Sequence, residues 1–313
     1  MNRRPRPSPA RGNVFMLLFL AFMLIVSFGF GIIVVIAEFA GFDLGGMYAG
    51  AALYVVLFLV PGLGYLLLTR QKHRDVLKWR PIELRAALVV IAIAISLIPL
   101  ASLISLLGSF VFAPIIDDYL IDLTSYPFWF MMLSVAVLPA FLEEFIIRGA
   151  LYKEFERLPI KKIAIITGLF FGIMHLNFHQ FFYAAVLGII YAYILYYTQS
   201  IWAPILMHFV NNGIAVALAY FLPDMAELGY GHEEPTMLMT IAVFGVLSLL
   251  GLAVTLICLK YLKANAAPPP VFEDEGDEDQ PKVFTWAFWM VVVLFLMVAA
   301  LIEVGARLGD GVL

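Results

Sequence analysis

The sequence predicts an all-α protein, a polytopic bundle of about eight or nine transmembrane helices. Hydrophobic residues make up 63% of the chain and charged residues only 13%, whereas a typical soluble domain is about half apolar and about a quarter charged. A water-soluble fold of 313 residues could not cover this much apolar surface with polar side chains. Because backbone groups in lipid must be satisfied within their own segment, and the apolar runs are too long for barrel strands, we predict helices.

Nine apolar runs reach or approach the roughly 20 residues that a helix needs to cross a bilayer. The first follows an arginine-rich N-terminus, but it is longer than the core of a secretory signal, so we interpret it as the first span. The fifth, sixth and seventh runs are short or closely joined, so their ends are poorly marked. The nine runs are residues 14–37, 47–69, 86–112, 127–147, 161–178, 181–198, 201–222, 236–259 and 283–303.

Basic and acidic residues alternate from one predicted loop to the next. Lysines and arginines gather before the first run, between the second and third runs, and between the fourth and fifth runs. The loops between these positions carry aspartates and glutamates instead. Because lysine and arginine are enriched on the cytoplasmic side, we predict a multi-pass protein of the cell membrane with a cytoplasmic N-terminus and an outer C-terminus.

One acidic segment accounts for the negative net charge of the chain. The formal charge is −4, but six acidic residues lie between 273 and 279, and without them the charge would be +2. They belong to residues 264–282, a proline-rich and then acidic segment whose composition cannot form a core. We therefore predict a disordered linker, and we expect the span behind it to be an appendage. The chain has no extended basic stripe, which argues against a nucleic-acid partner.

A few ionisable residues lie inside the predicted spans rather than in the loops. Glu143, Glu144 and Arg148 lie near the end of the fourth run, His175 lies in the fifth and His208 in the seventh. A charged group at the middle of a bilayer costs at least about 2.5–3.5 kcal/mol, so such residues usually have a function. We therefore treat them as candidate site residues.

Their spacing predicts which side chains share a helix face. Glu144 and Arg148 are four residues apart and can form an ion pair, whereas Glu143 is rotated by about 100° from Glu144 and can face a different neighbour. The fourth helix is expected to end at a turn at Pro159. Glu143 and His175 each lie 16 residues from Pro159. If the helices before and after Pro159 form an antiparallel hairpin, the two side chains are at the same distance from the turn and therefore at the same depth in the membrane.

Two further spacings complete the candidate site. His208 and Asn212 are four residues apart, on one face of the seventh predicted span. Gly168 and Gly172 form a Gly-x-x-x-Gly step that lets the fifth span approach a neighbour closely, and Phe171 between them is a candidate wall of the cavity. We expect three helices to deliver a carboxylate, two imidazoles and an amide to one shallow intramembrane cavity near the cytoplasmic face.

This set of side chains suits the hydrolysis of an amide bond. A glutamate in a partly desolvated site can act as a general base toward water, and a histidine can orient that water and give a proton to the leaving amine. A second histidine with an amide can stabilise the developing oxyanion, typically a contribution of a few kcal/mol. The competing explanation is structural, because a histidine in a membrane helix often makes a helix–helix hydrogen bond and an ion pair four residues apart often only stabilises its helix.

The same residues resemble the three motifs of the CPBP intramembrane proteases. This family contains the CAAX-type prenyl endopeptidases and their bacterial bacteriocin-processing relatives, and is also called the abortive-infection family. The resemblance covers about residues 85–222. The motifs are Glu143-Glu144-Phe-Ile-Ile-Arg148, Phe171-Gly-Ile-Met-His175 and His208-Phe-Val-Asn-Asn212.

The resemblance implies a glutamate-dependent intramembrane endopeptidase with no obligatory metal and no other cofactor. Its implied partners are the lipid bilayer and a membrane-associated protein or peptide substrate. Specificity for prenylated substrates is not implied, because bacterial members often act on other substrates. The implied catalytic residues are Glu143, His175, His208 and Asn212, with Glu143 as the base, and the implied supporting residues are Glu144, Arg148 and Phe171.

Together with the apolar runs, the resemblance divides the chain into six parts. The protease-like core is flanked by membrane helices on both sides, and the acidic linker separates the last helix from the others. The parts are a cytoplasmic basic N-terminus (1–12), two transmembrane helices with a basic loop (13–84), the core (85–222), a further transmembrane helix (223–263), the linker (264–282) and a C-terminal transmembrane helix (283–313).

Three other functions fit the same residues. A zinc hydrolase could use Glu143, His175 and His208 as ligands, although the sequence has no His-Glu-x-x-His helix. A proton-coupled transporter also uses intramembrane glutamate and histidine, but transporters often contain internal repeats and this sequence shows none. The third is a non-catalytic membrane scaffold, such as a bacteriocin immunity protein.

Overall fold

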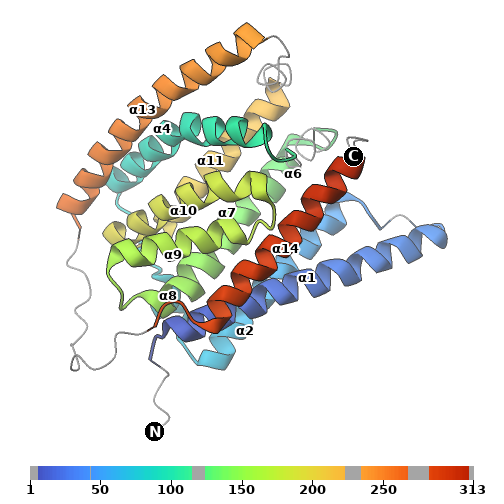
Figure 1. The fold of residues 1–313 in the computed structure, drawn as a ribbon. Coiled ribbons are helices and arrows are strands. Elements are labelled where there is room, and N and C mark those ends of the chain that lie inside the picture. The colour runs from blue at the N-terminus through green and yellow to red at the C-terminus, as the bar shows by residue number, and fades with distance from the viewer. Residues whose placement is uncertain (1–5, 43, 115–123, 223–233, 267–281, 310–313) are drawn as a thin grey trace.

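The computed structural model describes residues 6–42, 44–114, 124–222, 234–266 and 282–309, and helices are the only regular secondary structure in these residues. Eight helical segments are long and apolar enough to cross a membrane, which confirms the predicted all-α polytopic bundle (Figure 1). In chain order the helices are α1 (Pro9–Phe39), α2 (Met47–Thr69), α3 (His73–Leu77), α4 (Leu84–Ser109), α6 (Phe128–Met131), η1 (Met132–Val137), α7 (Leu138–Glu144), η2 (Phe145–Leu151), α8 (Tyr152–Phe155), α9 (Ile160–Ile173), α10 (Phe178–Thr198), α11 (Trp202–Phe221), α13 (Glu234–Ala264) and α14 (Trp286–Gly309).

The helix that carries the two glutamates is the most buried span of the bundle. It runs without a break over Phe128–Phe155 and contains α6, η1, α7, η2 and α8, of which η1 and η2 are π-helical. In its most apolar stretch of 18 residues, half of the residues are buried inside the protein, whereas the corresponding share is 11–33% in the other seven spans. We call residues 128–155 the central helix. It ends shortly before the turn at Leu158 and Pro159, as the position of the proline predicts.

The predicted fifth span is shorter in the structure than the apolar run indicates. We expected residues 161–178 to cross the membrane, but α9 has 14 residues, or about 21 Å at 1.5 Å per residue. Leu176 has a positive φ of 57°, and the Asn177 side chain accepts the backbone N–H of Gln180 at the start of α10. The prediction of a full span here is wrong because the turn itself lies within the apolar run, where hydropathy does not reveal it.

Contacts between distant segments identify the loops that meet at one end of the bundle. The amide of Ser8 donates to Oε2 of Glu154 at 2.8 Å, and the hydroxyl of Ser200 donates to the carbonyl of Arg80 at 2.5 Å. Nζ of Lys78 lies 5.1 Å from the ring centroid of Tyr152 on the central helix. The N-terminus, the end of the central helix and the loop before α4 therefore lie together, as the charge pattern predicts. We call this the basic end, formed by residues 6–13, 70–83, 153–162 and 199–201.

The other end of the bundle is formed by the start of α2 and the ends of α4 and α14. The amide of Met47 lies 3.5 Å from the hydroxyl of Tyr126, just before the central helix. The amide of Ala113 donates to Oε2 of Glu303 at 3.1 Å. We call this the opposite end. Its location outside the cell stays a prediction from the distribution of lysine and arginine.

The hairpin of α9 and α10 is packed through glycines. A Cβ atom on Gly168 would lie 2.6 Å from Cγ1 of Ile189, and one on Gly188 would lie 2.9 Å from Cα of Gly168. A Cβ on Gly172 would lie 2.6 Å from the carbonyl oxygen of Phe181. The predicted close approach of the Gly-x-x-x-Gly step to a neighbouring helix is therefore confirmed.

The C-terminal helix α14 is part of the core, and the expectation of an appendage is wrong. Phe288 and Phe295 are 3% and 4% exposed. The ring of Phe288 lies 5.7 Å from that of Phe170 on α9, and the ring of Phe295 lies 5.7 Å and 5.0 Å from those of Phe178 and Phe181 on α10. Figure 1 shows the start of α14 beside the first part of α1, from which it diverges toward its C-terminal end. Aromatic packing of this kind can join segments that a linker separates in the sequence.

The start of α14 is also attached to the first span. The side-chain amide of Asn13 donates to the carbonyl of Val283 at 2.7 Å and to the hydroxyl of Thr285 at 3.0 Å. The last span therefore begins at the basic end, next to the N-terminus. Most of the predicted disordered linker, residues 267–281, lies outside the described residues.

Candidate functional site

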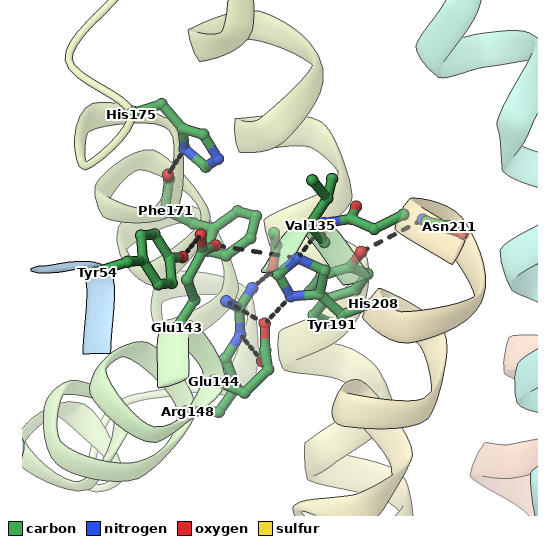
Figure 2. A network of polar contacts seen from close by, with 12 residues as sticks. Tyr54, Val135, Glu143, Glu144, Arg148, Phe171, His175, Tyr191, His208 and Asn211 are labelled. Carbon is green, nitrogen blue, oxygen red and sulfur yellow. Dashed lines mark hydrogen bonds and ion pairs between the residues drawn. The ribbon is translucent and has the colours of Figure 1, made fainter. Parts of the chain in front are cut away.

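The residues predicted from the three motifs gather around one cavity of about 1020 Å³ (Figure 2). The carboxylate, the two imidazoles, the amide and the aromatic wall all line it, and the ion pair lies directly behind them. The lining residues among those predicted are Glu143, Phe171, His175, His208 and Asn212.

A proline in the central helix prepares one wall of this site. Pro139 has no N–H, so it cannot make the α-helical bond to the carbonyl of Val135, four residues earlier. That carbonyl accepts instead from Nδ2 of Asn212 on α11, at 2.9 Å. The two π-helical segments η1 and η2 lie on either side of α7, and such segments are frequent at functional sites.

The carboxylate of Glu143 is hydrogen-bonded through one oxygen and unpaired at the other. Oε1 accepts a hydrogen bond of 2.5 Å from the hydroxyl of Tyr54 on α2. Oε2 is buried and has no hydrogen-bond partner among the described residues, and it lies 3.9 Å from Nε2 of His208 (Figure 2). Because Glu143 is 7% exposed and lines the cavity, this unpaired acceptor lies at the cavity wall.

The predicted ion pair of Glu144 and Arg148 is present and fully buried. Nε of Arg148 lies 3.2 Å from Oε2 of Glu144, and both side chains are 0% exposed. Nη2 of Arg148 donates to the carbonyl of Gly188 on α10 at 2.8 Å. Its guanidinium also lies 4.5 Å from the ring centroid of Phe171 and 5.0 Å from that of Tyr191. A buried charge needs such partners, because an unpaired one costs several kcal/mol.

His208 connects the two glutamates and the amide. Its Nδ1 lies 3.2 Å from Oε1 of Glu144, and because a carboxylate only accepts hydrogen bonds, Nδ1 carries a proton. In the neutral ring Nε2 is then an acceptor, and Nδ2 of Asn212 lies 3.2 Å from it. Asn212 thus directs its amide nitrogen at His208 and Val135, and Nε2 becomes a donor only when His208 is a cation.

His175 lies on the turn after α9, on the same cavity but apart from Glu143. Its Nδ1 lies 2.7 Å from the carbonyl of Phe171, so Nδ1 is the donor and Nε2 is left available. Its own carbonyl accepts from Nδ2 of Asn177 at 3.0 Å, which helps to fix the turn. Among the described residues no hydrogen bond or ion pair joins His175 to Glu143, and Figure 2 shows the two side chains separated.

Three residues in contact with the site are not revealed by the motif spacing. Tyr54 binds Glu143 from α2, and Tyr191 lies beside both Arg148 and His208, with ring centroids 5.6 Å apart in the second pair. Nδ2 of Asn211 donates to the hydroxyl of Tyr191 at 3.3 Å. Tyrosine is common in membrane helices, so neither tyrosine differs in the sequence from the aromatic residues around it.

The proposed zinc ligands are not arranged as a metal site. Among the described residues no group of three histidine, cysteine, aspartate or glutamate side chains is placed to hold a metal ion. Glu143 and His208 are close to one another, but His175 lies on a different part of the cavity wall. The geometry therefore does not favour the zinc hydrolase as an alternative.

The cavity extends away from the basic end. We expected it near the cytoplasmic face, and its depth in the membrane stays a prediction. Glu143 lies near the middle of the 28-residue central helix, and the lining includes Met47, Leu106, Leu218 and Ile302 toward the opposite end. No lining residue belongs to the basic end as defined above. The fully buried pair of Glu144 and Arg148 lies behind this lining.

The comparison with known families identifies the segment that holds this site. Residues 125–214 match the family described as type II CAAX prenyl endopeptidase Rce1-like. All seven residues predicted from the motifs lie in the matched segment. No curated protein and no solved structure matches the chain. The resemblance to the CPBP family of CAAX-type endopeptidases is therefore confirmed for residues 125–214.

Proposed function

We propose that this protein is an intramembrane endopeptidase in which Glu143 activates the water that hydrolyses a peptide bond. The observation that supports the proposal most directly is the carboxylate of Glu143, which is hydrogen-bonded through Oε1 and keeps a buried, unpaired acceptor at Oε2. A general base needs such a free acceptor for the proton of the water that it activates. The lining of the cavity and the family match of residues 125–214 agree with this chemistry.

Each of the site residues has its own role in the proposed reaction. Oε2 of Glu143 takes a proton from water as the water oxygen bonds to the substrate carbonyl carbon. Glu143 then gives this proton to the amide nitrogen as the carbon–nitrogen bond breaks, which leaves a carboxylic acid and an amine. His175 orients the water through Nε2. His208 and Asn212 stabilise the developing oxyanion. Glu144 holds the imidazole of His208 in place, since its carboxylate lies 3.2 Å from Nδ1.

The substrate class follows from the position and lining of the cavity. The site lies within a bundle of membrane-spanning helices, and its walls are largely apolar with a few polar groups. The substrate is therefore a membrane-associated protein or peptide rather than a soluble protein or a nucleic acid. The protein lies in the cell membrane with its N-terminus and basic end in the cytoplasm.

The function is tested with the full chain purified in detergent and a library of membrane peptides. We expect the wild type to cleave a peptide and Glu143→Gln to cleave none. Glu156→Gln is the control, because Glu156 lies in the loop directly after the central helix, and this variant should cleave at a rate close to that of the wild type. Each variant is compared at equal folded fraction, measured by thermal unfolding. If Glu143→Gln is as active as the wild type, the proposal is wrong. If a metal chelator abolishes the activity of the wild type, the zinc hydrolase is favoured instead.

The orientation is tested by cysteine labelling in a Cys258→Ser background. Cys258 is the only cysteine of the chain. A cysteine at His73, in the basic end, should react with a membrane-impermeant maleimide only after the cells are permeabilised. A cysteine at Phe42, between α1 and α2, should react in intact cells. The reverse pattern would show that the basic end faces outward.

A further inference from the structure

We infer that Tyr54 is a positioning residue for the catalytic base, holding one oxygen of Glu143 and so fixing the place of the other, which stays free to accept the proton of water. The inference rests on the proposed function of Glu143. Tyr54 lies on α2, outside the matched residues 125–214, so neither the motifs nor the family match assigns it a role. Its hydroxyl donates to Oε1 of Glu143 at 2.5 Å, and both residues line the cavity (Figure 2).

The bond is one of two equivalent contacts between α2 and the central helix. Tyr65, eleven residues after Tyr54, donates to Oε1 of Glu154 at 2.6 Å, and Glu154 is eleven residues after Glu143. Both bonds join residues 89 apart in the sequence. Eleven residues are about three helical turns, so the two helices run in the same direction with a fixed offset, and the two tyrosines lie on nearly the same face of α2.

Close packing between the two contacts fixes this offset. A Cβ atom on Gly62 would lie 2.5 Å from Cε1 of Phe145, so only glycine lets α2 approach the central helix at this point. The ring of Tyr54 packs on that of Phe58, with centroids 4.6 Å apart. The hydroxyl of Tyr54 is therefore held in place by the backbone of α2 and by its neighbour, and does not depend on a freely rotating side chain.

The hydroxyl of Tyr54 makes the one hydrogen bond that the Glu143 carboxylate accepts among the described residues. Nε2 of His208 is 3.9 Å from Oε2, beyond hydrogen-bond distance. Without Tyr54 the carboxylate could rotate about its last torsion and turn Oε2 away from the water. The other charged and titratable groups near the Glu143 carboxylate lie on four elements. They are Glu144 and Arg148 on the central helix, His208 on α11, Tyr191 on α10 and His175 after α9.

Tyr54→Phe tests the inference, because it removes only the hydroxyl. We expect kcat to fall by about tenfold or more, with KM within about twofold of the wild type, since a hydrogen bond to a charged group is lost and substrate contacts stay. Tyr65→Phe is the matched control on the same helix, because it removes the same kind of bond from a glutamate remote from the cavity. It should lower thermal stability about as much as Tyr54→Phe while keeping the wild-type kcat.

The outcomes separate this inference from the proposed function. A wild type that cleaves no peptide would overturn both. If the wild type cleaves, Glu143→Gln does not, and Tyr54→Phe keeps the wild-type kcat, the inference is wrong and the role of Glu143 stands. Equal losses of kcat in Tyr54→Phe and Tyr65→Phe would show that both tyrosines only stabilise the bundle, which also overturns the inference.

Discussion

Glu144 of the central helix and His208 of α11 are joined by a hydrogen bond of 3.2 Å between Oε1 and Nδ1. The residues are 64 positions apart in the sequence, and this bond connects the buried ion pair to the imidazole that lies next to Glu143. Glu144 therefore has two partners, Arg148 and His208. It neutralises a buried charge and also sets which nitrogen of His208 faces the cavity.

Glu144→Gln should destabilise the protein strongly. The change leaves the guanidinium of Arg148 buried without a counter-charge, and breaking a buried pair in this way costs about 3–5 kcal/mol. Thermal unfolding in detergent measures the loss. Glu156→Gln is the control, because Glu156 pairs with Lys153 at a partly exposed position and should cost about 1 kcal/mol or less. If Glu144→Gln were fully stable but inactive, the roles of the two glutamates would be reversed.

Gly168→Ala should weaken the packing of α9 against α10. The added Cβ would lie 2.6 Å from Cγ1 and 2.8 Å from the backbone nitrogen of Ile189, so the backbone must shift, at a cost of about 1–3 kcal/mol. Gly29→Ala is the matched control on α1, since no atom lies within 4 Å of its added Cβ. It should be neutral or gain up to about 1 kcal/mol from helix propensity. Equal unfolding temperatures for the two variants would contradict the packing.

Phe295→Ala should unfold the protein more easily than Leu296→Ala, although the two residues are adjacent on α14. Phe295 is 4% exposed and packs on two aromatic rings of α10, whereas Leu296 is 48% exposed. Truncation of a buried phenylalanine costs about 3–5 kcal/mol, and truncation at a lipid-facing position costs far less. The unfolding temperatures of the two variants, measured in detergent, test this difference. Equal small losses would mean that α14 is an appendage after all.

Lys78 should make the stability of the protein depend on pH in the alkaline range. Burial lowers the pKa of Lys78 from 10.5 to about 8, with Glu156 acting against the shift and Lys153 and Arg80 adding to it. Between these two values the folded protein binds fewer protons than the unfolded chain, so its unfolding free energy rises with pH. Below about pH 8 the ammonium is charged in both states and its burial is a constant penalty.

Thermal unfolding between pH 8 and pH 10.5 tests this dependence. Lys78→Met should remove the rise that Lys78 contributes and should be more stable than the wild type at the lower end of the range. Lys161→Met changes an exposed lysine and should keep the wild-type slope. A slope unchanged by Lys78→Met would show that Lys78 keeps its ordinary pKa, about 10.4, in the folded protein.

The sequence by itself determined the fold class and the local pairs of the site. Glu144 with Arg148, and His208 with Asn212, are four residues apart, and helical periodicity alone places such residues on one face. The clustering of the basic loops at one end also follows from the sequence, because charge marks the ends of spans wherever they pack. These features depend on single helices, so they need no knowledge of how the helices meet.

Only the tertiary structure decided which helices contribute to the site and how. The bonds from Tyr54 to Glu143 and from Glu144 to His208 depend on the rotation and offset of separate helices. In a soluble protein the apolar face of a helix indicates its buried side, but in lipid both the buried and the exposed faces are apolar and packing sets the contacts. For the same reason the hydropathy of α14 did not reveal that Phe295 packs into the core.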